Sequence, residues 1–213
     1  MQLADVGRVY TRSEDTVDAL IHAAGVLFAV NGGAWLLFHV THVSAVASVS
    51  VYCAGLFLML TASAVYNLCP PGNTKAWLRR LDHAAIFIMI AATYTPLAAN
   101  RLAPPAGGII LGLIWFFASV GIALKVLFPR RFEMASLALY IGMGWMIVSV
   151  IKPLSHAMAT VDFRLLMAGG IVYSAGVAFY LIERIPYHKA IWHGFVLVAA
   201  MLHFTAIASE FAT

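Results

Sequence analysis

The sequence predicts an all-α integral membrane protein, a bundle of seven transmembrane helices, and three observations support this prediction. Hydrophobic residues make up 62% of the 213 residues, and charged residues make up only 10%, whereas a soluble globular domain carries about 25%. The mean hydropathy is +0.90. Seven apolar runs approach or exceed the length of about 20 residues that a helix needs to cross a bilayer. This composition excludes a soluble enzyme, a disordered chain and a nucleic-acid-binding module.

The apolar runs fill most of the chain. In order, they lie at residues 17–38, 44–66, 83–100, 106–128, 133–151, 165–182 and 190–211. The connections are too short to hold a soluble domain, so we expect a single membrane domain over residues 1–213. Residues 1–15 are rich in charge and lack a small-residue cleavage site before the first run, which indicates an N-terminal segment rather than a removable signal peptide. Cys53 and Cys69 are too few for a disulfide framework, so we expect free thiols.

The distribution of basic residues predicts the orientation in the membrane. The N-terminal side of the predicted spans carries Arg8, Arg12, Lys75, Arg79, Arg80, Lys125, Arg130, Arg131, Arg184 and Lys189. The opposite side carries only Arg101, Lys152 and Arg164. Since basic residues collect in cytoplasmic loops, we expect residues 1–15 in the cytoplasm and the C-terminus outside. An inner (plasma) membrane of a bacterium is the expected location.

Polar side chains at the cytoplasmic ends of three spans predict a site, because such groups are costly in a membrane unless they face the bundle interior. Ser63 and Asn67 are four residues apart and share one helical face, and so are Lys189 and His193. Asp82 begins the third span at the same depth. The alternative interpretation is that these residues are helix ends in contact with interfacial water.

Two further histidines lie within spans. His22 follows Asp18 by four residues and enters the first span at the same cytoplasmic level. His203 lies ten residues beyond His193, which places it about 15 Å deeper. We interpret His203 as an imidazole that forms a hydrogen bond with a neighbouring helix rather than as a metal ligand.

Several motifs together resemble the haemolysin III branch of the progestin and adipoQ receptor superfamily. They are SAVY at 63–66, LDHAAI at 81–86, ATYTP at 92–96, GIVYSAG at 170–176 with FY at 179–180, and IWH at 191–193 with HF at 203–204. The resemblance extends over nearly the whole chain from Arg12. It implies a seven-helix bundle with a cytoplasmic N-terminus.

The resemblance also implies a zinc site held by three histidines near the cytoplasmic end, with a serine and an aspartate nearby. Here the serine is Ser63 and the aspartate is Asp82. The three ligand positions are Asn67, Lys189 and His193, so only His193 is retained. A lysine ammonium has no lone pair to donate, and an amide oxygen is a poor substitute for imidazole.

We therefore expect no metal cofactor, and zinc only if this argument fails. Our hypothesis is that the Lys189 ammonium replaces the metal and pairs with Asp82, while Ser63, Asn67 and His193 complete a degenerate polar site. His188 would restore a metal site only if the last span began late, because it lies about 140° around a regular helix from His193.

Three classes of function remain open. A non-catalytic lipid-binding, receptor-like or membrane-homeostasis role is the preferred interpretation, with membrane lipids as partners, no nucleic acid, and a homo-oligomer left open. An intramembrane lipid amide hydrolase is the second, for which a metal-free enzyme would use Ser63 as nucleophile, His193 as base and Asp82 to orient it. A channel or pore-forming haemolysin is the third, although the spans are apolar nearly all round.

Overall fold

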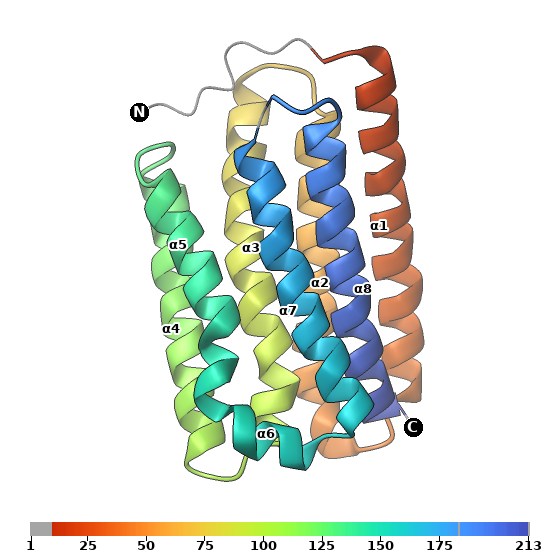
Figure 1. Ribbon diagram of the computed structural model, residues 1–213, viewed down its shortest axis with the longest axis vertical. Coiled ribbons are helices and arrows are strands. Elements are labelled where there is room, and N and C mark those ends of the chain that lie inside the picture. Colours follow the sequence, from red (N-terminus) through yellow and green to blue (C-terminus); the bar gives the residue numbers. More distant parts are fainter. Residues whose placement is uncertain (1–9, 183, 213) are drawn as a thin grey trace.

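The computed structural model is a bundle of helices and describes residues 10–182 and 184–212 (Figure 1). Within that part of the chain, seven helices are long and apolar enough to cross a membrane, as the sequence predicts. The fifth of them is interrupted. The helices are α1 (Arg12–His39), α2 (Val43–Leu68), α3 (Asn73–Asn100), α4 (Ala106–Leu127), α5 (Glu133–Gly144), a 3₁₀ segment η1 (Trp145–Val150), α6 (Ile151–Ala157), α7 (Thr160–Leu181) and α8 (His188–Ala212). The predicted N-terminal segment lies mostly outside the described residues, Arg8 included.

Helices α1, α3 and α7 each begin at least five residues earlier than the apolar runs that predict them. Helix α1 starts at Arg12 because Thr11 forms a capping box with Glu14: the Glu14 amide donates to Thr11 Oγ1, and the Thr11 amide donates to Glu14 Oε2. The second oxygen of Glu14 accepts from the Tyr187 amide at 2.8 Å. One buried carboxylate therefore fixes both the start of α1 and the turn before α8. Helix α3 starts at Asn73, so Asp82 lies in its third turn.

The helices surround α3, which is the most deeply buried of the seven spans. Helix α3 contacts α2, α4, α5 and α8, while α1 packs between α2 and α8, and α7 packs against α8. Helix α5 packs against α3 and α4 but scarcely against α7. The upper end of the bundle in Figure 1 is where α1, α3, α5 and α8 begin and where α2, α4 and α7 end. This end is called the upper end.

The fifth span changes from α-helix to 3₁₀-helix at Trp145, and Tyr94 of α3 fills the break. The Tyr94 hydroxyl donates to the Gly144 carbonyl oxygen at 2.8 Å and accepts from the Ile147 amide at 2.7 Å. Backbone groups in a bilayer must find partners within the protein. Tyr94 thus compensates for the interrupted helical hydrogen bonding and holds α5 against α3.

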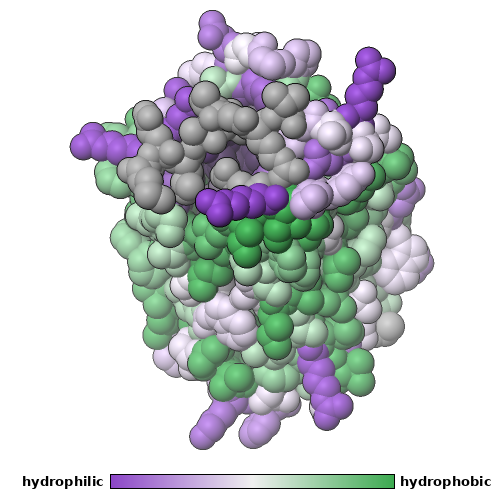
Figure 2. All heavy atoms as spheres, turned by 45° about the horizontal axis from the view of Figure 1, so that its top comes forward, coloured by the Kyte–Doolittle hydropathy of each residue, from purple (hydrophilic) through white to green (hydrophobic). Residues whose placement is uncertain are grey.

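Polar and apolar residues separate along the bundle. Figure 2 shows hydrophobic residues over the side of the molecule and hydrophilic residues gathered toward its ends. Together with the seven apolar helices, this distribution is that of an integral membrane protein. Cys53 and Cys69 are both free thiols, as the sequence predicts.

We predict that Gly107→Ala destabilises the bundle and that Gly108→Ala does not. A Cβ atom on Gly107 would lie 2.4 Å from the Ala98 carbonyl oxygen, an atom of the α3 backbone that cannot move freely. Overpacking of this kind costs about 1–3 kcal/mol. A Cβ atom on Gly108 meets nothing within 4 Å. Thermal unfolding in detergent should show a lower Tm for Gly107→Ala alone; equal Tm values for the two variants would contradict the close contact between α3 and α4.

Candidate functional site

The upper end of the bundle contains a cavity of about 720 Å³. Residues from all seven spans line it. The five residues of the predicted polar site, Ser63, Asn67, Asp82, Lys189 and His193, are all among them, together with His22 and His188. The convergence expected from the sequence is therefore present as a shared cavity, although the individual pairings differ from those expected.

Ser63, Asn67 and Asp82 form one polar wall of the cavity. Because Ser63 and Asn67 are one helical turn apart on α2, the Asn67 side-chain amide donates to the Ser63 carbonyl oxygen at 2.9 Å and lies 3.5 Å from Ser63 Oγ. The Asp82 carboxylate on α3 interacts with the Ser63 hydroxyl. All three residues are partly buried. This wall can offer hydroxyl and amide donors and a carboxylate to a polar ligand.

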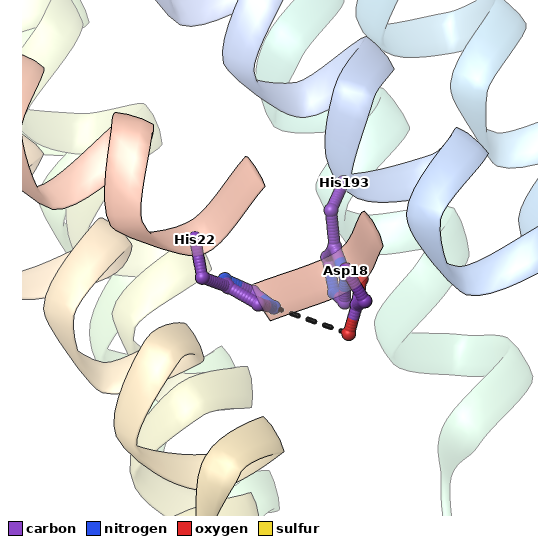
Figure 3. A group of neighbouring side chains, drawn as sticks. All are labelled: Asp18, His22 and His193. Carbon is purple, nitrogen blue, oxygen red and sulfur yellow. Dashed lines mark hydrogen bonds and ion pairs between the residues drawn. The ribbon is translucent and has the colours of Figure 1, made fainter. Parts of the chain in front are cut away.

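A second polar cluster joins α1 to α8. The His193 Nδ1 atom lies 2.6 Å from Asp18 Oδ1, and the His22 Nε2 atom lies 3.5 Å from Asp18 Oδ2 (Figure 3). The two imidazole rings are 4.3 Å apart between centroids. His22 is only 5% exposed, yet its Nε2 atom makes no hydrogen bond of good geometry. In the sequence, Asp18 was noted only for its four-residue spacing from His22. That spacing does not reveal that α8 lies beside α1, so the contact between Asp18 and His193 could not be predicted from it.

The expected ion pair between Lys189 and Asp82 is not formed. The Lys189 ammonium instead lies 4.0 Å from the centroid of the Tyr10 ring, over the face of that ring. His188 stacks on the same ring, with the two centroids 5.7 Å apart. Since α8 begins at His188 as a regular helix, His188 and His193 point in different directions, and His188 takes no part in the Asp18, His22 and His193 cluster.

His203 behaves as the sequence predicts. Its Nε2 atom lies 3.0 Å from the Leu166 carbonyl oxygen of α7, so the imidazole connects α8 to its neighbour deep in the bundle. The close approach of the two helices at this level depends on Gly169, where a Cβ atom would lie 2.2 Å from the His203 ring. This prediction is confirmed, and His203 is separated from the second polar cluster by nearly three helical turns.

An ionic cluster at the upper end was missed by the sequence analysis. The Glu133 carboxylate of α5 contacts the Lys125 ammonium of α4 at 2.5 Å and the Arg79 guanidinium of α3 at 2.9 Å. Nearby, the Tyr140 hydroxyl donates to the His83 carbonyl oxygen at 2.8 Å. All three charged residues line the cavity. Sequence spacing gave no signal for this cluster, because its members come from three different helices. Residue spacing does not specify how helices are ordered in the bundle.

The residues of the cavity that could bind a metal share only His193 with the ligand positions implied by the resemblance. Asn67 and Lys189 supply no imidazole, and Lys189 contributes a cation, so that donor set does not fit a zinc ion. Asp18, His22 and His193 each offer one ligand atom, and these atoms all lie within 4.8 Å of one another. A carboxylate and two imidazoles are donors that transition metals accept.

Comparisons with known proteins agree with the fold. The sequence profile of the family described as "Haemolysin-III related" matches residues 10–204. The chain is 37% identical to Hemolysin-3 of Bacillus cereus over 197 residues, which cover 91% of this chain and 90% of the relative. It is 35% identical to the Hemolysin-3 homolog of Bacillus subtilis (strain 168), with 89% and 90% covered. It is 29% identical to the human Monocyte to macrophage differentiation factor, with 74% and 67% covered. No solved structure matches the chain.

We predict that Glu133→Gln destabilises the bundle, because it leaves the Lys125 ammonium, only 6% exposed, without a counter-charge. Breaking a fully buried pair costs roughly 3–5 kcal/mol. Since Glu133 is 19% exposed, we expect a smaller loss of about 2 kcal/mol. The double variant Glu133→Gln with Lys125→Met should recover most of the loss in a denaturant titration. A double variant no more stable than Glu133→Gln alone would show that the charge of Lys125 is not the cause.

Proposed function

We propose that this chain, which belongs to the haemolysin-III-related family, binds an amphiphilic lipid in its cavity and does not hydrolyse it. The observation that carries the proposal is the cavity itself. Its volume of about 720 Å³ falls in the range of roughly 300–1,000 Å³ that is typical of small-molecule sites. The cavity lies inside a membrane-spanning bundle, where the most abundant small molecules are lipids.

The lining of the cavity supports a ligand with a polar head and an apolar chain. Along α3, the lining extends from Arg79 at the upper end to Tyr94, a distance of about 22 Å along the helix axis. The upper part carries the ionisable residues. The deeper part is lined mainly by apolar and aromatic side chains, including Met89, Ile90 and Trp145. A lipid with its head at the upper end and its chain toward the middle of the bundle would match both parts.

The charges around the cavity favour an anionic head group. Four cationic side chains line it, namely Arg79, Lys125, Arg184 and Lys189, and two carboxylates, namely Asp82 and Glu133. A carboxylate or phosphate head would accept hydrogen bonds from the cations that remain available. The concentration of basic residues on this side supports an orientation in a bacterial inner membrane in which the upper end faces the cytoplasm.

The contact between α5 and α7 supports a route for the ligand from the bilayer. These two helices scarcely pack against one another, and side chains from both line the cavity. The indole nitrogen of Trp145 donates to Ser174 Oγ of α7 at 3.0 Å, which connects them at one level. A lipid chain could pass between α5 and α7 without disturbing the contacts of α3 with its neighbours.

Two features support binding over hydrolysis. The three residues of the metal-free alternative are not arranged as a catalytic triad: His193 interacts with Asp18, while Ser63 interacts with Asp82 directly. The nucleophile of such a triad needs an adjacent base, and no hydrogen bond joins Ser63 to His193 in the described structure. Lys189 also lies one turn before His193, where the resemblance implies a metal ligand.

We predict that Gly170→Phe weakens lipid binding at least about ten-fold, which corresponds to 1.4 kcal/mol. Gly170 lines the deep part of the cavity and has open space where a side chain would extend. Gly142→Phe is the matched control, because Gly142 also has open space but is exposed and lies outside the cavity lining. Binding would be measured with a fluorescent long-chain fatty acid and purified protein in detergent.

Equal binding by the parent and by Gly170→Phe would overturn the proposed ligand site. Turnover requires its own measurement: release of fatty acid from ceramide and phospholipid substrates in vesicles would replace the binding role with hydrolysis. Solute flux across the same vesicles would instead indicate a channel. Binding without turnover or flux is the expected result.

We predict a preference for anionic over neutral single-chain lipids, and we predict that Lys189→Gln reduces it. The measurement is competition between a fatty acid and a monoacylglycerol of equal chain length for the fluorescent probe. The fatty acid should compete better, and its advantage should fall as the salt concentration rises, because surface-accessible charge interactions are screened. Equal competition by both lipids in the parent protein would contradict the assignment of the head group.

A further inference from the structure

We infer that Asp18, His22 and His193 bind a divalent transition metal ion, zinc by the chemistry of the donors, between α1 and α8. This inference goes beyond the proposed function because it requires no lipid. The site shares only His193 with the ligand positions implied by the family resemblance. Its other two donors come from α1, so the site is a different one at a neighbouring place in the cavity.

Helix geometry brings the donors together. Asp18 and His22 are one turn apart on α1 and present their side chains on the same face. Helix α8 packs against that face and directs His193 toward the Asp18 carboxylate (Figure 3). The side chains are 13%, 5% and 12% exposed for Asp18, His22 and His193 respectively. All three donors are therefore held on rigid elements and largely shielded from solvent.

The distances are close to those of a coordinated ion. Bonds of about 2.0–2.2 Å from zinc to nitrogen and oxygen place two tetrahedral ligand atoms roughly 3.4 Å apart. The present pairs are 2.6 Å for His193 Nδ1 and Asp18 Oδ1, 3.5 Å for His22 Nε2 and Asp18 Oδ2, and at most 4.8 Å across the cluster. The His193 and Asp18 atoms would move apart by roughly 0.8 Å to reach that spacing, while the His22 and Asp18 atoms already match it.

The state of His22 distinguishes a metal site from a simple hydrogen-bonded cluster. In a simple cluster, Asp18 would accept one good hydrogen bond from each imidazole. Only His193 makes such a bond, and the buried Nε2 atom of His22 is left without one. A buried polar atom without a partner costs about 1–3 kcal/mol. A metal ion would satisfy that atom and the Asp18 charge together, and two imidazoles with one carboxylate form a known three-ligand zinc set.

The positive charge nearest to the cluster on α8 does not occupy the site. The Lys189 ammonium lies over the Tyr10 ring, and the described ion pairs of Asp18 are with His22 and His193 alone. The Asp18 carboxylate therefore retains a negative charge that a cation can neutralise. The ion would join α1 to α8 at the upper end of the bundle, where the polar part of the cavity lies.

The experiment measures zinc binding directly on purified, lipid-depleted protein in detergent. After dialysis against a chelator, zinc affinity would be determined by competition with a chromogenic chelator, and bound zinc by elemental analysis. We expect one zinc ion for each chain. Asp18→Asn and His22→Ala should each weaken zinc binding at least about ten-fold, since even outer-shell changes at metal sites cost 10–100-fold. Asp18→Asn keeps the size of the side chain and its capacity to accept a hydrogen bond from His193.

Two control variants keep the result interpretable. His39→Ala removes an exposed histidine at the far end of α1 and should leave zinc binding unchanged. Asn67→Ala changes a position implied by the resemblance and should also leave it unchanged. If Asn67→Ala removes zinc and Asp18→Asn does not, the relocated site is wrong. If the parent binds no zinc, or if Asp18→Asn and His22→Ala bind it equally well, the inference is also wrong.

A thermal readout covers the case in which a variant folds poorly. Zinc should raise the Tm of the parent, because an ion that binds only the folded state stabilises it. It should not raise the Tm of Asp18→Asn. Fatty-acid binding by the zinc-free parent would be measured in parallel, so that a failure of the metal site and a failure of the lipid site give different results.

Discussion

The cost of placing ionisable groups in a bilayer is the constraint on which this structure depends. The charged residues near the upper end can be buried only where they have partners, and they find them around a single cavity. Glu133 neutralises Lys125 and Arg79 from two other helices, and Asp18 lies between two histidines. These ionisable groups therefore gather around one cavity rather than facing lipid. The cavity is a consequence of that requirement as much as of helix packing.

Much of the fold could be predicted from the sequence because the signals are local. The apolar runs gave the spans, and the four-residue spacings of Ser63 with Asn67 and Asp18 with His22 gave shared helical faces. Helix order is not local, and it decides the pairings. Because α1 packs against α8, His193 meets Asp18, whereas the family resemblance suggested Asp82 as the partner of Lys189. The ionic cluster around Glu133 could not be predicted for the same reason: its members lie on three helices.

The chemistry of the site follows from which polar groups are already satisfied. Asn67, Ser63 and Asp82 interact with one another. The Lys189 ammonium lies on the face of the Tyr10 ring, which is a favourable place for a cation. Asn67 of α2 and Lys189 of α8 stand at positions where the family resemblance implies metal-binding histidines, and neither side chain is a good zinc ligand. On α1, by contrast, the buried Nε2 atom of His22 lacks a hydrogen bond.

This separation into two groups of polar residues would allow one cavity to hold both the proposed lipid and the proposed metal ion. The wall formed by α2 and α3 offers hydroxyl, amide and carboxylate groups to a head group. The cluster of Asp18, His22 and His193 lies on α1 and α8, and Asp18 interacts with both histidines. An ion there would add positive charge to a space lined by four cations and two carboxylates. The electrostatics of an occupied metal site and of an anionic lipid head would then reinforce each other, so each ligand should favour binding of the other.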